Sequence, residues 1–223
     1  TGYTFTLEDW DKVIDIFKSF PHKNIICVVD IAYLDFAGEA YEYRAFLKKL
    51  TGLPHHILPL IAFSASKGFT MYGMRCGALL CMAPTAELAK EFRDAASVAS
   101  RASWSNGNHS AMAVISKIFA DDALLAKVTD ERNHYMQILQ ERGRAFMEEA
   151  NKIGLKCCPY DSGFFITVPC ENAEEVGKAL QVLNVFAIPL GPGIRVSVAS
   201  NTVEECRAIP GRLQQAIESV NGK

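Results

Sequence analysis

The sequence lacks a long hydrophobic run and an excess of charge of either sign. No apolar stretch approaches the ~20 residues that a membrane-spanning helix needs. The 23 basic and 25 acidic residues give a formal net charge of −2, which argues against nucleic acid or an anionic membrane surface as the partner. The early acidic residues Glu8, Asp9 and Asp11 do not fit a secretory signal. We therefore expect neither a membrane nor a nucleic-acid partner.

Metal-binding and redox motifs are also missing. The seven cysteines form no CxxC pair and no zinc spacing, and Cys157-Cys158 are adjacent. We interpret them as buried, reduced thiols of a cytoplasmic protein and expect no metal site. At 223 residues, of which 49% are hydrophobic, the chain can form one large domain or two modest ones.

Strands and helices alternate in the first part of the chain. Thr6-Leu7-Glu8-Asp9 resembles a capping box at the start of a helix. The expected strands, each buried, are Ile25–Val29, Leu58–Phe63 and Ala78–Met82, with a helical segment at Ala40–Leu50. This order predicts a mainly parallel α/β sheet.

Helices fill the middle of the chain. We expect them at Thr85–Ser103, Ser110–Phe119 and Asp121–Ile153. The last should continue through Gly143, since one interior glycine costs only ~1 kcal/mol. We interpret it as a helix that links two domains.

The pattern after Gly154 is typical of an α+β domain. The expected strands are Leu155–Cys158, Phe164–Val168, Val185–Pro189 and Ile194–Ala199, and the expected helices are Ala173–Leu183 and Thr202–Val220, the second with Pro210 as a kink or restart. The predicted domains are residues 1–120, which hold the α/β sheet, and 121–223, which hold the long helix and the α+β part.

One loop concentrates the groups that carry chemistry. Ser64, Ser66, Lys67 and Arg75 follow a buried strand. Two hydroxyls and a guanidinium suit a phosphate, and nearby cations favour a reactive, deprotonated lysine that can form a Schiff base with a carbonyl. These residues predict a site for a phosphorylated ligand beside an amine nucleophile.

Three further residues stand out. Asp30 ends a buried strand, at the sheet edge where α/β proteins place ligands. Arg195 lies within an apolar strand, where a charge must be paired or face a cleft; it suits a substrate carboxylate. Arg101, taken alone, is typical of the end of a helix.

Together these motifs resemble the aspartate and aromatic amino acid branch of the class I aminotransferases, which have fold type I and depend on pyridoxal phosphate. Motif and spacing match over nearly the whole chain. The resemblance implies a set of cofactor-binding residues: Asp30, Tyr33, Ser64, Ser66, Lys67 and Arg75. Asp30 would pair with the pyridine nitrogen, Tyr33 would contact the phenolic oxygen, and Lys67 would be catalytic. Ser64, Ser66 and Arg75 would hold the phosphate.

The resemblance also implies substrates and assembly. Arg195 would bind the substrate α-carboxylate, and Arg101 would reach the neighbouring subunit of a homodimer to bind a distal carboxylate. The implied reaction transfers an amino group from an L-amino acid, aspartate or aromatic, to a 2-oxo acid such as 2-oxoglutarate. A β-lyase or decarboxylase on the same fold is the alternative.

Two departures from the family pattern qualify these expectations. Gly107-Asn108 follows Ser105-Asn106 where the family usually has two prolines. Thr1-Gly2 resembles the end of an Asn-Pro-Thr-Gly motif, and the match covers only the second part of such an enzyme. We therefore expect a C-terminal fragment with the second half of the large domain, and we expect it to be catalytically silent by itself.

Overall fold

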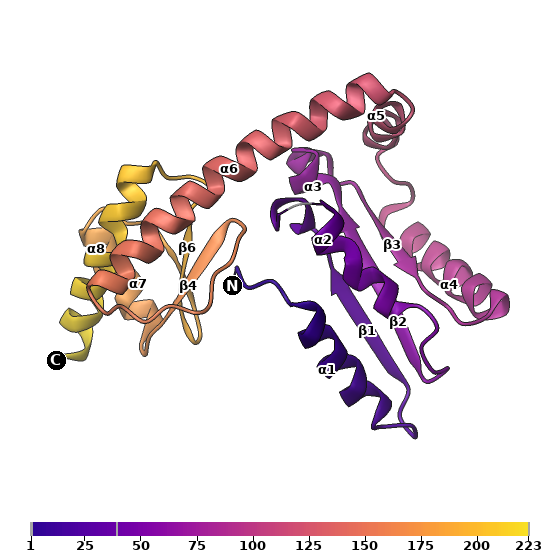
Figure 1. Ribbon diagram of the computed structural model, residues 1–223, viewed down its shortest axis with the longest axis horizontal. Coiled ribbons are helices and arrows are strands. Elements are labelled where there is room, and N and C mark those ends of the chain that lie inside the picture. Colours follow the sequence, from indigo (N-terminus) through magenta and orange to yellow (C-terminus); the bar gives the residue numbers. More distant parts are fainter. Residues whose placement is uncertain (1, 39, 223) are drawn as a thin grey trace. The chain divides into compact units, whose positions relative to one another are not determined.

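The computed structural model describes residues 2–38 and 40–222 of the protein (Figure 1). The chain forms two compact units. The N-terminal unit is Phe5–Arg132, and the C-terminal unit combines Thr1–Thr4 with Asn133–Lys223. The division falls inside the longest helix, α6 (Asp122–Lys152).

The N-terminal unit contains a three-stranded sheet in the order β1-β2-β3. Its elements before α6 are α1 (Leu7–Lys18), β1 (Ile25–Asp30), η1 (Leu34–Phe36), α2 (Ala40–Arg44), η2 (Ala45–Leu50), β2 (Ile57–Ser64), α3 (Ala65–Gly68), η3 (Tyr72–Met74), β3 (Gly77–Cys81), α4 (Ala86–Trp104) and α5 (His109–Phe119). β1 and β2 are parallel, and β3 is antiparallel to β2. The expected α/β fold is confirmed.

Local signals set the start of α1 as predicted. The Thr6 side chain accepts a hydrogen bond from the Asp9 backbone, and the Asp9 carboxylate accepts one from the Thr6 backbone. One turn later Trp10 stacks on Phe46, with ring centroids 4.8 Å apart. Phe46 belongs to the core cluster beside β1, together with Ile14, Val29 and Leu50.

The predicted burial of two strands was wrong. On β1, Ile26 and Val28 are 64% and 61% exposed. The core cluster contacts the opposite face of this strand, through Cys27 and Val29. β3, which has β2 as its one neighbour in the described sheet, is exposed along most of its length. The expected helical segment at residues 40–50 is present as α2 followed by the 3-10 helix η2.

The C-terminal unit is α+β, as expected. Its elements after α6 are β4 (Phe165–Pro169), α7 (Ala173–Val182), β5 (Ile188–Leu190), β6 (Gly193–Ser197) and α8 (Val203–Asn221). The sheet order is β4-β6-β5, and both strand pairs are antiparallel. Fully buried side chains from three of these elements, Val176, Leu180, Ile194 and Leu213, form its core.

Pro159 and Pro210 have different effects on the secondary structure of this unit. The predicted strand at residues 155–158 does not form; Cys158 N donates one ladder bond to Thr167 O at 2.8 Å. Pro159 follows at once and has no N–H with which to extend the ladder. Pro210, by contrast, lies inside α8, which runs without a break.

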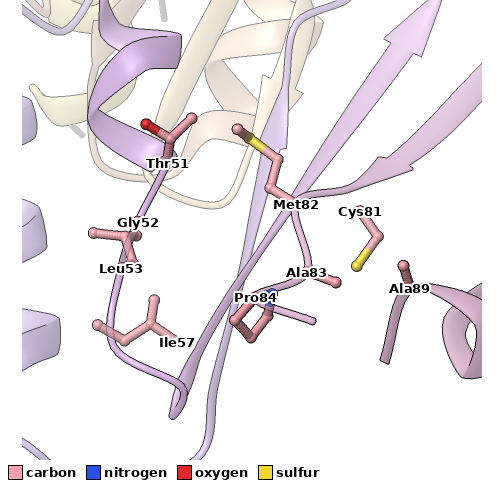
Figure 2. A pocket seen from close by; sticks show the side chains of 9 residues that line it. All are labelled: Thr51, Gly52, Leu53, Ile57, Cys81, Met82, Ala83, Pro84 and Ala89. Atoms are coloured by element: carbon pink, nitrogen blue, oxygen red, sulfur yellow. The ribbon is translucent and has the colours of Figure 1, made fainter. Parts of the chain in front are cut away.

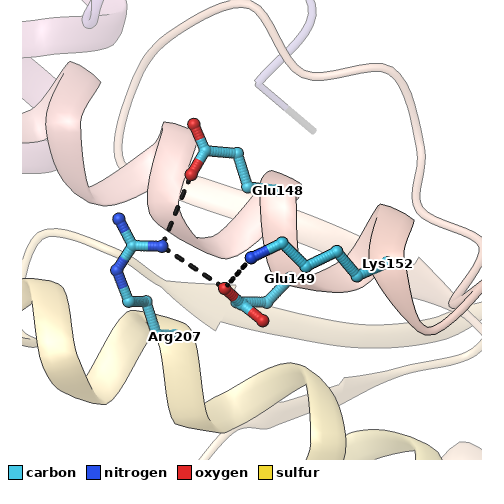
Figure 3. Close-up of polar contacts among 4 residues, drawn as sticks. All are labelled: Glu148, Glu149, Lys152 and Arg207. Atoms are coloured by element: carbon cyan, nitrogen blue, oxygen red, sulfur yellow. Dashed lines mark hydrogen bonds and ion pairs between the residues drawn. The ribbon is translucent and has the colours of Figure 1, made fainter.

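Surface ion pairs join α6 and α8 in the same unit (Figure 3). Arg207 lies 3.4 Å from Glu148 and 3.3 Å from Glu149, and Lys152 lies 2.7 Å from Glu149. The hydrogen bond from Lys152 lowers the pKa of Glu149 below its ordinary value. Because these groups are solvated, the network contributes little to stability.

No helix within residues 2–38 and 40–222 is long and apolar enough to cross a membrane. All seven cysteines are free thiols.

Candidate active site

The candidate catalytic lysine lies on a single helical turn at the end of β2. Ser64 ends this strand, and its Oγ accepts a hydrogen bond from the Ser66 backbone at 3.2 Å, which caps α3. Lys67 is the third residue of α3, and its carbonyl accepts from Thr70 N at 3.0 Å. Ser66 is buried and Lys67 is half-buried. The turn from strand to helix thus presents two serines and the lysine at one edge of the sheet.

Strand pairing brings Arg75 to the same place. Ser64 pairs with Gly77 across β2 and β3, and Ala65 N donates to Cys76 O at 3.0 Å. Arg75 has a left-handed backbone conformation (φ +50°), which is uncommon for a residue other than glycine. Its guanidinium is exposed and donates to Tyr72 O at 2.8 Å. An exposed guanidinium is suited to an anion.

Two tyrosines surround the lysine amine. Lys67 Nζ lies 4.0 Å from the centroid of the Tyr72 ring and 5.5 Å from that of Tyr33. Tyr33 was predicted from the sequence, but Tyr72 was missed, because a tyrosine in a glycine-punctuated loop has no periodicity that marks it. The amine thus lies against aromatic faces that favour a cation.

Asp30 ends β1 at the same edge of the sheet. In the parallel register it is opposite Ala62, two residues before Ser64. The Asp30 side chain is exposed, and Oδ1 accepts from Ala32 N at 2.9 Å. One carboxylate oxygen therefore fixes the local turn, and the carboxylate stays open to solvent.

Arg101 is not brought to the lysine. Within the part of the chain that the structure describes, its guanidinium donates to Ser105 O at 3.0 Å, at the end of its own helix α4, and contacts no residue around Lys67. Asn108, in contrast, was missed. Its side chain caps α5 through Ala111 N and donates to Met74 O at 2.9 Å, next to Arg75. An asparagine before a helical segment is the signal that could have found it.

Arg195 lies in the C-terminal unit, on β6. Its guanidinium carbon is 4.6 Å from the centroid of the Phe165 ring. Its Nε is buried and has no hydrogen-bond partner among the described residues. A buried donor without a partner costs free energy unless a ligand satisfies it, so this arginine is suited to an anionic group.

A hollow lies at the other end of β2 (Figure 2). Ile57, the first residue of the strand, lines it together with Met82 and Pro84. The lining carries no charged side chain, so it does not suit a phosphate or a carboxylate.

Comparisons with known proteins show the family to which the chain belongs. The family model described as aminotransferase class I and II matches residues 1–213. The aromatic-amino-acid aminotransferase of Escherichia coli (strain K12) is 32% identical over 199 residues, which are 86% of this chain and 48% of that protein. The aspartate aminotransferase of the same strain is 26% identical over 217 residues, 94% of this chain and 52% of that protein.

A solved structure is similar over nearly the whole chain. The crystal structure of an aminotransferase from Anaerococcus prevotii DSM 20548 has a TM-score of 0.92 and 32% sequence identity, and the match covers 97% of this chain and 54% of that one. The chain spans about half the length of the curated relatives it matches. By motif, by sequence and by fold, it belongs to the class I and II aminotransferase family.

Proposed function

We propose that the protein is a pyridoxal phosphate-dependent aminotransferase and that this chain supplies the catalytic lysine, most of the phosphate site and the substrate arginine. The observation that carries the proposal is the position of Lys67. Its amine lies 4.0 Å from the Tyr72 ring and 5.5 Å from the Tyr33 ring, on a turn that begins at Ser64. Family membership supports the same reading.

The residues present fit the cofactor chemically. The hydroxyls of Ser64 and Ser66 and the guanidinium of Arg75 can bind a phosphate. Asp30 can hold a proton on a pyridine nitrogen, since its carboxylate is open to solvent at the sheet edge. When bound, pyridoxal phosphate supplies an aldehyde and a ring that absorbs negative charge from the α-carbon of an amino acid.

The chain's own groups perform the remaining work. Tyr33 would donate a hydrogen bond to the phenolic oxygen of the ring. Lys67 Nζ would be the nucleophile toward the aldehyde and, once the substrate amine has displaced it, would take the proton from the substrate α-carbon and deliver it to the former aldehyde carbon, two atoms away. In the C-terminal unit, the Arg195 guanidinium would bind the α-carboxylate; its buried Nε, which has no partner among the described residues, supports this role.

The substrate class follows from the relatives and from Arg101. Curated relatives act, by name, as aromatic-amino-acid and aspartate aminotransferases. We propose that Arg101 selects an acidic side chain in the neighbouring subunit of a homodimer, and that an L-amino acid, aspartate or aromatic, donates to 2-oxoglutarate. The seven free thiols support a cytoplasmic location.

We also propose that the 223-residue chain by itself binds the cofactor weakly and is inactive. Asp30, Tyr72 and Arg75 are all exposed in it, so these residues would enclose a bound ring and phosphate only loosely. A visible absorption band that borohydride bleaches, with added mass at Lys67, would contradict this.

The test uses the protein expressed from its complete reading frame. With pyridoxal phosphate, 2-oxoglutarate and L-aspartate or L-tyrosine, mass spectrometry should find glutamate and the matching 2-oxo acid in equal amounts. Lys67→Ala should lower the rate by more than about a thousandfold, whereas Lys48→Ala, at an exposed position of η2, should leave it unchanged. With a cysteine conjugate as the substrate, ammonia and pyruvate without glutamate would indicate a β-lyase instead.

A further inference from the structure

A cluster of three charged residues lies directly behind the lysine turn. Asp35, in η1, places one carboxylate oxygen 2.6 Å from Arg44 and the other 3.3 Å from Arg132, near the middle of α6. The side chains of Asp35 and Arg132 are only 15% and 14% exposed, whereas that of Arg44 is 48% exposed. The Asp35–Arg132 pair is therefore the shielded part of the cluster and is the less screened by solvent.

Both members of this pair touch the residue after the lysine. Arg132 donates to Gly68 O at 3.4 Å. A Cβ at position 68 would overlap the Asp35 carboxylate, so Asp35 lies against the Gly68 backbone itself. The guanidinium carbon of Arg132 is also 5.9 Å from the ring centroid of Phe69, the next residue.

The turn depends on such contacts. α3 has four residues, and a single turn cannot hold its own conformation because nucleation costs more than one hydrogen bond returns. Its orientation must therefore come from its cap and its neighbours. Asp35 is, in addition, two residues from Tyr33, whose ring lies near the lysine amine. The same pair thus connects the segment that carries Tyr33 to the turn that carries Lys67.

We propose that Asp35 and Arg132 are positioning residues for Lys67. They hold the backbone at Gly68 so that the Lys67 amine meets the aldehyde of pyridoxal phosphate in a reactive geometry. The role rests on the proposed function. It predicts that the reaction of the amine and the binding of the phosphate can be separated, since no hydrogen bond or ion pair among the described residues joins Ser64, Ser66 or Arg75 to the pair. Loss of the pair should slow the reaction of the amine and leave the binding of ring and phosphate intact.

The experiment measures these two quantities separately in the protein expressed from its complete reading frame. Affinity is measured with pyridoxine 5′-phosphate, which has the ring and phosphate but no aldehyde. Reaction is measured with pyridoxal phosphate: the Lys67 amine condenses with the aldehyde, water leaves, and borohydride delivers hydride to the carbon–nitrogen double bond. Peptide mass spectrometry then gives the rate at which Lys67 is labelled.

Asp35→Asn and Arg132→Met should each lower the labelling rate at saturating ligand by about tenfold, because small displacements of a reacting group are costly. Their affinity for pyridoxine 5′-phosphate should stay within about twofold of wild type. Arg132→Lys keeps a cation for Asp35 and should restore part of the rate. Asp11→Asn, which removes the carboxylate of the Lys49 ion pair in the same unit, should change neither quantity.

Each of the other possible outcomes would overturn the positioning role or the proposed function. Unchanged labelling in the folded variants, or equal losses of rate and affinity, would overturn the positioning role. Arg132→Met leaves Asp35 paired with Arg44 and keeps the variant set informative if Asp35→Asn does not fold. Loss of structure in both would show a purely structural role. If wild type neither binds pyridoxine 5′-phosphate nor is labelled at Lys67, the proposed function itself fails.

Discussion

Gly143 offers a test of packing in the C-terminal unit. It lies inside α6, where alanine would be better by about 1 kcal/mol on helix propensity alone. A Cβ at this position, however, would overlap the ring and hydroxyl of Tyr160. We predict that Gly143→Ala destabilises the protein in spite of its better propensity.

The expected loss in the free energy of unfolding follows from the displacement of the Tyr160 ring. Overpacking costs about 1–3 kcal/mol. Displacing Tyr160 also threatens its 2.8 Å hydrogen bond to Gly163 O, which is worth about 1 kcal/mol. The gain in propensity offsets about as much as the lost hydrogen bond, so the free energy of unfolding should fall by a net ~1–3 kcal/mol.

A matched control lies in the same unit. Gly211, inside α8, has open space where a Cβ would be, so Gly211→Ala should raise the free energy of unfolding by up to about 1 kcal/mol. Urea unfolding followed by circular dichroism measures both. Each kcal/mol should move the midpoint by roughly 0.5 M at a typical urea slope.

The two glycines should therefore respond with opposite signs. A rise in the midpoint for Gly143→Ala, alongside that for Gly211→Ala, would refute the argument. In a Tyr160→Ala background the ring is gone, and Gly143→Ala should then become stabilising. This reversal separates a clash with Tyr160 from any other cost at the helix.

Three further predictions concern titration and capping. Burial raises the pKa of Tyr160 to about 12. The stabilisation from its neutral form should be complete below pH 10 and be lost as the pH rises from about 10 to 12. Absorbance at 295 nm should show one tyrosine that ionises at a higher pH than the others, and Tyr160→Phe should remove that transition. Burial also raises the pKa of Cys157 and of Cys206 to about 11. At pH 8, iodoacetamide should therefore label both thiols more slowly in the folded protein than in the urea-unfolded protein, in which thiols titrate near 8.5. Equal labelling rates would contradict this. Thr6→Ala removes the cap of α1 and should cost about 1 kcal/mol, measured by tryptophan fluorescence in urea, with no loss if the capping box is unimportant.

Much of the helical structure could be predicted because its signals are local. A capping box needs residues three positions apart, and both α1 and α8 begin at one. The path of α6 through Gly143 was likewise predictable from its periodic pattern. The burial of β1 and β3 could not be predicted, because an apolar strand has the same sequence pattern whether or not another element covers each of its faces.

The candidate site likewise has a part that the sequence could predict and a part that depends on the fold. Ser64, Ser66, Lys67 and Arg75 lie within twelve residues, so their chemistry could be recognised in the sequence. Strand pairing places Gly77, two residues after Arg75, opposite Ser64. Their roles toward a cofactor stay predictions, as do those of Arg101 and Arg195.

The sequence by itself determined the family and the local caps and singled out the candidate lysine, since each depends on residue types at short, fixed spacing. Only the tertiary structure revealed that Tyr72 covers the lysine amine and that Arg132, 65 positions after Lys67, reaches the next residue's carbonyl. The physical reason is that such contacts form between segments that only the completed fold brings together. No pattern within either segment records them.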